Sequence, residues 1–508
     1  MKKNSQLKIG AVLSYIQMGL GVVIGLVYTP LMTNMLGQSE YGLYNTVSST
    51  ISMLSVLNLG FNSSYIRYYA KYKEENDDNS IHKLNGMFFL IFCVIGVVAF
   101  ICGVFMAMHL EFVFAEGLTR KEYSIAKILM LLLTINLTVS FPMSVFSNII
   151  SANERFIFLK LLGMLKTVGG PLITLPLLLI GFRSIAMVSV SVGISFITDL
   201  LYIFYVIYIL KNKFIFHNFE KGLFSSLFVY TSLIAINLIV DQINWNIDKI
   251  LLGRFKGTAT VAIYSVGFSL YQYYQMFSNS ISSVFTPRIH KIVNGTKENL
   301  TVQKKQLTEL FTKIGRIQFL ILGLIASGLL FFGKDFIIHI WVGVDYEESY
   351  YVMLLLVLPA SIALIQNLGI EIQRAENRHQ FRSIAYLIMA IINLVMSLYL
   401  CQVYGAIGSA IGTAVSLIAA NGFAMNIYYH KKCNIDIIYF WKGILGLSRG
   451  LLIPIMLGLF MNYYSGIYST PKYFAQIVAY IIAYCASMWF VGMNDFEKSI
   501  ILAPIIKR

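Results

Sequence analysis

The sequence predicts an all-α polytopic membrane protein with about 14 transmembrane helices, and two observations support this prediction. About fourteen apolar stretches of about 20 residues follow one another, joined by short polar connections. A helix needs about 20 mostly apolar residues to cross the roughly 30 Å hydrocarbon core, and a helix satisfies its own backbone there. Charged residues make up only 12% of the 508 residues, against about 25% in soluble domains.

The expected spans follow these apolar stretches in order. They cover residues 9–35, 43–66, 84–108, 124–150, 161–180, 185–210, 223–252, 259–285, 310–333, 350–372, 383–402, 407–430, 444–464 and 474–493. The first stretch begins after Lys2 and Lys3 but reaches Leu36 without a small-residue cleavage site, so we interpret it as a span and not as a signal peptide. An even number of spans places both termini on the same side of the membrane.

The distribution of basic residues predicts which side that is. Of the 39 lysines and arginines, 26 fall in the two tails and one set of alternate loops, 7 in the opposite loops and 6 within spans. By the positive-inside rule, both termini of this multi-pass protein are therefore expected in the cytoplasm. The net charge of +15 then reflects basic loops facing anionic membrane lipid, and nucleic acid is not an expected partner.

The two halves of the chain share a series of motifs. Residues 1–210 align with residues 223–430 at offsets between 216 and 224. The paired positions are Leu36-Gly37 with Leu252-Gly253, Pro142 with Pro359, Ser63-Ser64 with Ser282-Ser283, Arg155 with Arg378, and Gly181 with Gly405. We expect two parallel six-helix lobes around a central cleft, an additional helix pair at 444–493 and a cytoplasmic tail at 494–508. Parallel repeats of this kind are typical of transporters.

The seventh expected span carries the most polar residues. Asn237, Asp241, Asn244 and Asp248 follow helical spacing and fall on one face, with Lys249 beside them. Charged groups inside a membrane usually face a cavity or a partner, because burial in lipid costs about 2.5–3.5 kcal/mol each. We interpret the stripe as lining a hydrated cleft. The alternative is that Asp248 and Lys249 pair with neighbouring helices.

The eighth expected span combines aromatic and polar side chains. Tyr271 and Gln275 share one face with Tyr264, Ser278 and Ser282, and Asn279 lies beside it. Aromatic rings next to amides and hydroxyls suit stacking on sugar rings and hydrogen bonding to their hydroxyls. Ordinary interhelix packing is an equally good interpretation, since serine and glutamine often join membrane helices.

Two arginines close equivalent spans of the two expected lobes. Arg67 follows Asn62 at the end of the second span, and Arg288 ends the eighth. A guanidinium binds phosphate through its planar fork, so both are candidate phosphate-binding residues. The alternative is a purely topological anchor. Further bases are expected to extend to the membrane surface where they lie near helix ends: Lys127, Lys166, Lys313, Arg316 and Arg449.

Signatures of enzymes, metal sites and cofactors do not occur in the sequence. No two of the five cysteines lie at the spacing of a metal-ligand pair, and we interpret them as packing residues. There is no phosphate-binding loop, no GxSxG and no HExxH motif. No catalytic residue, metal or cofactor is therefore expected.

Several motifs resemble the Wzx-like polysaccharide-biosynthesis flippases of the multidrug/oligosaccharidyl-lipid/polysaccharide exporter superfamily. They are Gly10-Ala11-Val12-Leu13-Ser14-Tyr15, Tyr28-Thr29-Pro30, Met35-Leu36-Gly37 with Glu40-Tyr41-Gly42-Leu43-Tyr44, Leu59-Gly60-Phe61, Asp248-Lys249-Ile250-Leu251-Leu252-Gly253 and Tyr404-Gly405-Ala406-Ile407-Gly408-Ser409-Ala410. The resemblance implies translocation of a polyprenyl-diphosphate-linked oligosaccharide to the outer leaflet by alternating access. Other polysaccharide-assembly membrane proteins are then expected partners, and the last two spans are expected to form a groove for the lipid tail.

Two other functions are compatible with the same residues. A cation-coupled small-molecule exporter of the same superfamily would use Asp241 and Asp248 as its ion site. A membrane glycan polymerase would need an acidic catalytic pair near the outer surface, where the sequence offers only scattered carboxylates. The sequence therefore favours the flippase.

Overall fold

The computed structural model describes residues 3–114, 118–219, 222–296, 299–376, 378, 380–464 and 469–506, and these residues form helices and connecting loops without a β-strand. The α-helices are α1 (Lys3–Leu36), α2 (Gln38–Met53), α3 (Phe61–Glu74), α4 (Asp78–Met108), α5 (Arg120–Ala152), α6 (Phe156–Leu179), α7 (Ser184–Phe204), α8 (Leu223–Phe255), α9 (Thr258–Gly295), α10 (Leu300–Asp335), α11 (Glu348–Ile365), α12 (Leu368–Ala375), α13 (Gln380–Leu417), α14 (Met425–Lys432), α15 (Ile437–Ser448), α16 (Leu452–Tyr463), α17 (Thr470–Ser487) and α18 (Asp495–Ile506). Short 3-10 or π segments are η1 (Leu54–Asn58), η2 (Leu110–Phe112), η3 (Tyr205–Ile209), η4 (Phe336–Trp341), η5 (Val344–Tyr346), η6 (Ile418–Ala424), η7 (Arg449–Leu451) and η8 (Met488–Gly492).

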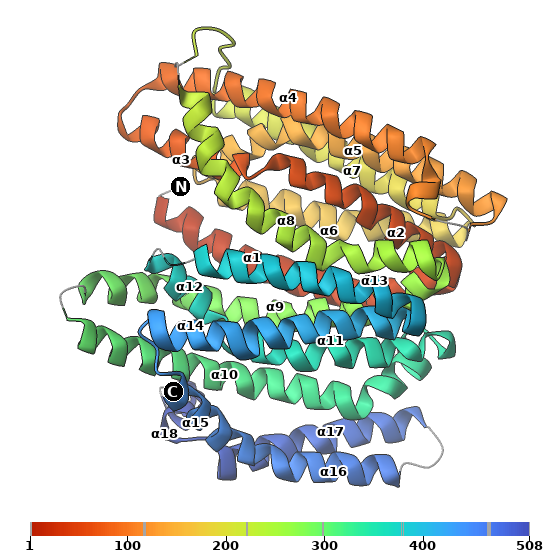
Figure 1. The fold of residues 1–508 in the computed structure, drawn as a ribbon, viewed down its shortest axis with the longest axis vertical. Coiled ribbons are helices and arrows are strands. Elements are labelled where there is room, and N and C mark those ends of the chain that lie inside the picture. Colours follow the sequence, from red (N-terminus) through yellow and green to blue (C-terminus); the bar gives the residue numbers. More distant parts are fainter. Residues whose placement is uncertain are drawn as a thin grey trace. The chain divides into compact units, whose positions relative to one another are not determined.

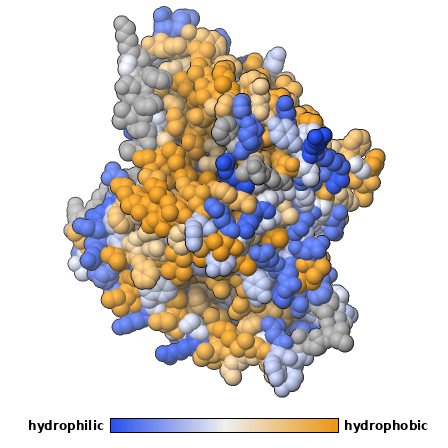
Figure 2. Space-filling model, turned by 45° about the vertical axis from the view of Figure 1, so that its right-hand side comes forward, coloured by the Kyte–Doolittle hydropathy of each residue, from blue (hydrophilic) through white to orange (hydrophobic). Residues whose placement is uncertain are grey.

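The predicted all-α membrane fold is confirmed. Among the described residues, ten helical segments are long and apolar enough to cross a membrane. They cover eleven of the fourteen expected spans, because the segment Gln380–Lys432 contains two of them, separated by a kink at Gly405. Apolar side chains cover much of the surface shown in Figure 2, as expected where helices face lipid.

Three of the fourteen expected spans lie outside these ten segments. They correspond to α2 with α3, to α8 and to α9, which together carry the candidate site residues. With 33 and 38 residues, α8 and α9 are long enough to cross the hydrocarbon core. The helical assignment of both is therefore as expected.

The second expected span, 43–66, is wrong as a continuous helix. The chain leaves α2 through η1, and Leu59 and Gly60 both adopt positive φ angles of 48° and 83° before α3 begins. A Cβ atom on Gly60 would lie 2.6 Å from Cγ2 of Ile234 on α8, so both the backbone angle and the close approach favour glycine. This break places Asn62 and Arg67 on a separate helix.

Helix packing divides the chain into two compact units. The first contains residues 1–265 and 394–409, and the second contains residues 266–393 and 410–508. In the first unit α4 packs along α5, α5 along α7, α1 along α6, and α2 along α8 (Figure 1). In the second unit α10 packs on α11 and α15, and α16 pairs with α17. The expected lobes at 1–210 and 223–430 remain a prediction.

Aromatic and aliphatic side chains fill the interior of each unit. In the first unit, Tyr65 and Phe88 are fully buried, and their rings meet edge to face at 5.2 Å. In the second unit, the Phe332 and Tyr480 rings meet in the same way at 5.4 Å and join α10 to α17. Such ring pairs stabilise a core beyond their burial alone, by about 0.5–1.5 kcal/mol.

Candidate functional site

The polar stripe of α8 runs from an exposed to a buried environment. Asp241 is exposed, Asn237 and Asn244 are half-buried, and Asp248 is only 3% exposed. The four residues share one helix face as the sequence predicts, but among them Asp241 alone is exposed. An exposed carboxylate on a membrane helix favours a position beside water, because lipid solvates it poorly.

The buried end of the stripe makes an interhelix hydrogen bond. The Tyr264 hydroxyl on α9 donates to Asp248 Oδ2 at 2.8 Å, and both side chains are buried. Lys249 is half-buried next to this pair. The geometry therefore favours a packing role for Asp248, which was the alternative interpretation from the sequence. That Asp241 and Asn244 line a hydrated cleft stays a prediction.

Most of the predicted α9 face is also used for packing. Tyr271, Tyr274, Ser278 and Ser282 are buried. The Ser278 hydroxyl donates to the Leu364 carbonyl at 2.9 Å, and the Tyr274 hydroxyl lies 2.7 Å from that of Ser361. These bonds tie α9 to α11, as membrane helices are commonly joined by hydroxyls.

Two members of the α9 face remain partly open. Gln275 is half-buried and donates its amide to the Tyr271 hydroxyl one turn earlier. Asn279 is exposed, and its Oδ1 accepts a hydrogen bond from Asn367 at 2.7 Å. These amides keep donors and acceptors near the surface of the second unit, where a glycan hydroxyl could reach them; sugar binding at this face stays a prediction.

Asn62 and Arg67 lie on α3, after the break at Gly60. The Asn62 side-chain oxygen accepts a hydrogen bond of 2.7 Å from Asn148 on α5, so Asn62 positions α3. Arg67 lies one and a half turns further along α3 and is exposed. A ligand at the surface of this unit can therefore reach the guanidinium of Arg67.

Arg288 lies at an open pocket of the second unit. It is exposed near the end of α9, and the pocket has a volume of about 460 Å³. Lys313 and Glu309 on α10 and Phe496 on α18 also line it. Pockets of about 300–1,000 Å³ are typical of small-ligand sites.

Sequence reasoning missed a polar network at one end of the first unit. Glu40 on α2 accepts hydrogen bonds from the Ser184 backbone and hydroxyl at 3.0 and 2.6 Å and pairs with Arg183 at 2.8 Å. Arg183 also donates to the Leu36 carbonyl at 2.5 Å, so α1, α2 and α7 are joined at their ends. The Glu40-Tyr41-Gly42 motif could have pointed to this network, but nothing near it in the sequence indicates that Arg183 and Ser184 are the partners of the Glu40 carboxylate.

The same end of the unit brings α2 against the start of α9. The Ser39 hydroxyl lies 2.8 Å from that of Thr258 and also donates to Glu122 at the start of α5. A Cβ on Gly42 would overlap the Thr258 carbonyl oxygen, so the two backbones touch. The start of α9, which leads into the expected eighth span, thus lies in close contact with the start of α2, which leads into the expected second span.

Comparison with known proteins identifies a matching family and a shared fold. A family model described as polysaccharide biosynthesis protein matches residues 10–293. The capsular polysaccharide biosynthesis protein CapF of Staphylococcus aureus is 24% identical over 219 residues, which are 42% of this chain and 52% of that protein. The match thus spans about half the length of this curated relative.

Two solved membrane proteins share the fold over most of the chain. The lipid II flippase MurJ in an inward closed conformation aligns with a TM-score of 0.65 and 16% identity, covering 98% of this chain and 99% of MurJ. A mutant form of the Vibrio cholerae MATE transporter VcmN aligns with a TM-score of 0.58 and 13% identity, covering 86% of this chain and 99% of that one. Both similarities concern the fold.

Proposed function

Since this chain belongs to the polysaccharide biosynthesis protein family, we propose that it is a flippase for a polyprenyl-diphosphate-linked oligosaccharide repeat unit. The family resemblance expected from the sequence motifs is confirmed by the match over residues 10–293. The unit would pass from the cytoplasmic to the outer leaflet by alternating access, for cell-surface polysaccharide assembly. Its partners would be this lipid-linked glycan, membrane lipid and other assembly proteins, and it would act as a transporter and not as an enzyme.

One observation carries the proposal from the fold to transport. Asp241 is exposed and Asn244 half-buried on α8, in a protein whose described part contains ten apolar membrane segments. An exposed carboxylate in that setting favours water or a polar cargo beside it, since its transfer into hydrocarbon costs about 2.5–3.5 kcal/mol on insertion scales. A hydrated path for a glycan would provide such surroundings.

We assign capture of the diphosphate to Arg67 and Arg288. Both guanidiniums are exposed on helices of the two halves of the chain, and the positive-inside rule favours the cytoplasmic surface for both. A hydrogen bond to a charged group contributes about 1.5–3 kcal/mol, so loss of either arginine should weaken headgroup binding roughly 10- to 150-fold. Lysine should restore binding only in part, because it lacks the planar fork.

The test is mass spectrometry of lipid-linked glycans in cells that lack the protein or carry a variant. Complete repeat units accumulating on the cytoplasmic side support the flippase. Arg67→Ala and Arg288→Ala should accumulate the same units at normal protein abundance, whereas Lys71→Ala on the same exposed surface of α3 should not. Normal export in both arginine variants would show that the arginines are topological anchors.

The second candidate is a cation-coupled small-molecule exporter. The carboxylates of Asp241 and Asp248 on one face of α8 and the structural similarity to a MATE transporter favour it. The glycan measurement separates the two functions, because loss of an exporter leaves the lipid-linked glycans unchanged. Placement in the plasma membrane with cytoplasmic termini is tested by impermeant labelling, which should reach cysteines introduced at 37–41 and 334–349 from outside.

A further inference from the structure

The pocket that contains Arg288 is lined by two kinds of side chain. Its bases are Arg288 on α9 and Lys313 on α10, both exposed, and Glu309 is its half-buried acid. Its apolar wall includes Ile292 and Ile317, together with side chains of α18. A pocket with net positive charge and an apolar wall suits an amphiphile with an anionic head.

The α18 side of the pocket comes from residues beyond the last expected span. Phe496 and Ile500 line the pocket and are 36% and 45% exposed. The sequence predicts residues 494–508 to be a cytoplasmic tail, and the structure shows that the described part of this tail forms a docked helix. The helix completes the pocket with apolar side chains that a free tail would leave in water.

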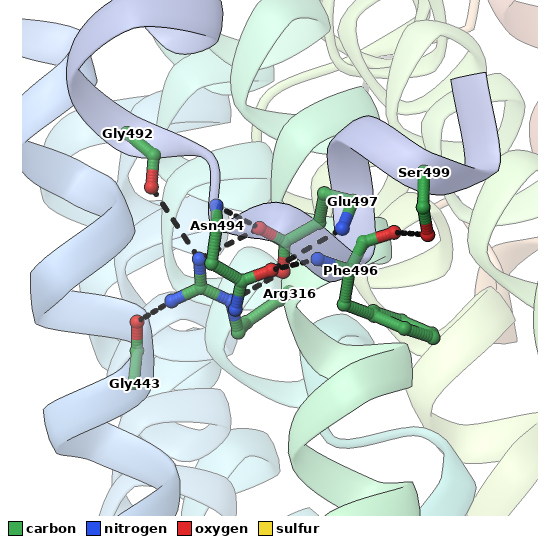
Figure 3. Close-up of polar contacts among 7 residues, drawn as sticks. All are labelled: Arg316, Gly443, Gly492, Asn494, Phe496, Glu497 and Ser499. Carbon is green, nitrogen blue, oxygen red and sulfur yellow. Dashed lines mark hydrogen bonds and ion pairs between the residues drawn. The ribbon is translucent and has the colours of Figure 1, made fainter. Parts of the chain in front are cut away.

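A buried ion pair holds α18 in this position (Figure 3). Arg316 Nε lies 2.5 Å from Glu497 Oε1, and Arg316 Nη2 lies 2.8 Å from Oε2, with both side chains less than a tenth exposed. Arg316 also donates to the Gly443 carbonyl on α15 at 2.5 Å. Asn494 caps α18, since its Oδ1 accepts hydrogen bonds from the backbones of Phe496 and Glu497. The bidentate geometry fixes the orientation of α18 as well as its distance from α10.

Lys313 lies one turn before Arg316 and contacts the same helix. Its Nζ lies 5.1 Å from the centre of the Phe496 ring, within the range of a cation–π interaction. The Arg316–Glu497 pair fixes the helix that carries this ring. Lys313 is thereby positioned at the pocket and stays exposed, so its ammonium can meet a ligand.

We infer that this pocket binds the phosphate of a lipid, with Arg288 and Lys313 at the phosphate and the Phe496–Ile500 face of α18 against the lipid chain. Basic pockets between helices on the cytoplasmic side commonly bind anionic headgroups. Phosphate could come from an anionic phospholipid or from the polyprenyl diphosphate of the cargo. The inference rests on the proposed function for Arg288, and it adds Lys313 as a phosphate-binding residue and Arg316–Glu497 as positioning residues.

The experiment measures lipid retention by the purified full-length protein. The protein is released for native mass spectrometry from bilayers of phosphatidylcholine alone, of phosphatidylcholine with phosphatidylglycerol, or of phosphatidylcholine with undecaprenyl diphosphate. We expect retention of one or both phosphate-rich lipids over phosphatidylcholine, and a loss of roughly tenfold or more in Lys313→Gln. Lys304→Gln is the matched control, because Lys304 is an exposed base on the same helix outside the pocket lining.

A second variant tests the apolar wall without touching a charge. Phe496→Ser should reduce retention of the same lipid, whereas Phe474→Ser on α17, at a side chain that is also exposed, should not. Equal retention of all three lipids by the parent, or equal losses in Lys313→Gln and Lys304→Gln, would overturn the inference. If the protein exports glycan but does not retain the phosphate-rich lipids, this site is refuted and the flippase proposal stands. If it retains these lipids through Lys313 but exports no glycan, the site stands and the flippase proposal is refuted.

Discussion

The ion pair between Arg316 and Glu497 gives the sharpest prediction, because one substitution should release a whole helix. Glu497→Gln removes the carboxylate that accepts two hydrogen bonds from Arg316 at 2.5 and 2.8 Å. Arg316 would then keep only the carbonyls of Gly443 and Gly492, at 2.5 and 3.4 Å, for a guanidinium that is 9% exposed. Removal of one partner of a buried ion pair destabilises by about 3–5 kcal/mol, since an uncompensated charge remains.

The loss should appear as local opening of α18. Cleavage by trypsin after Lys498, which is half-buried in this helix, follows the population of the opened form when opening is fast. A change of about 3–5 kcal/mol raises that population roughly 150- to 4,000-fold, up to the limit of full opening. The assay is the rate of cleavage at Lys498 in the purified protein.

Two control variants separate the buried charge from other effects. Asp495→Asn removes an exposed carboxylate from the first turn of α18 and should change the cleavage rate little, because such a charge contributes about 0.3–1 kcal/mol. The double substitution Arg316→Met with Glu497→Met removes both charges and should restore protection, since apolar replacements of a buried pair are often neutral or stabilising. If Glu497→Gln is cleaved at the same rate as Asp495→Asn, the buried ion pair does not hold α18. If the double variant is cleaved as fast as Glu497→Gln, the uncompensated charge of Arg316 is not the cause of the opening.

Three further predictions follow from single positions. A cysteine at Asp241 should react with small polar reagents faster than one at the half-buried Leu238, and equal protection of both would place the stripe in packing. Gly60→Ala should destabilise the purified protein against thermal unfolding by about 2–5 kcal/mol through its φ of 83° and the overlap with α8, whereas Gly19→Ala, with open space around it, should not. Cys433 should resist alkylation near neutral pH, because it is fully buried and burial raises the pKa of its thiol to about 12; rapid labelling of the folded protein would contradict this.

The length of the apolar stretches predicted most of the helices correctly. The prediction failed where a few residues change the direction of the backbone. Residues 43–66 look continuous because Leu54, Val56, Leu57 and Leu59 keep the segment apolar through η1 and the turn. The turn depends on positive φ angles at Leu59 and Gly60, and Gly60 was visible as the one residue that adopts such an angle easily. The close approach of Ile234, which makes glycine necessary there, comes from α8 and is absent from local sequence.

Contacts between distant residues explain why Arg316 was misjudged. The sequence marked it as an intramembrane base expected to extend to the membrane surface where it lies near a helix end, but its partner Glu497 is 181 residues away on a segment expected to be a tail. Snorkelling costs an arginine little, so composition gives no reason to search for a buried partner. Lys313, three residues earlier, is exposed as expected although it contacts the Phe496 ring of the same helix, and the contrast arises because Arg316 meets the buried carboxylate of Glu497.

Helical periodicity correctly grouped the polar residues of α8 and α9 on faces, but periodicity could not say which groups would be used for packing. On α8, Asp248 is buried where Tyr264 of α9 donates a hydrogen bond of 2.8 Å to its carboxylate. Asp241 lies two turns earlier on the same face and is exposed. A transport role for the stripe therefore depends on Asp241 and Asn244. Tyr264 donates to one oxygen of Asp248 at 2.8 Å, and this bond by itself does not decide between packing and ion binding at Asp248, so the glycan measurement has to separate the flippase from the cation-coupled exporter.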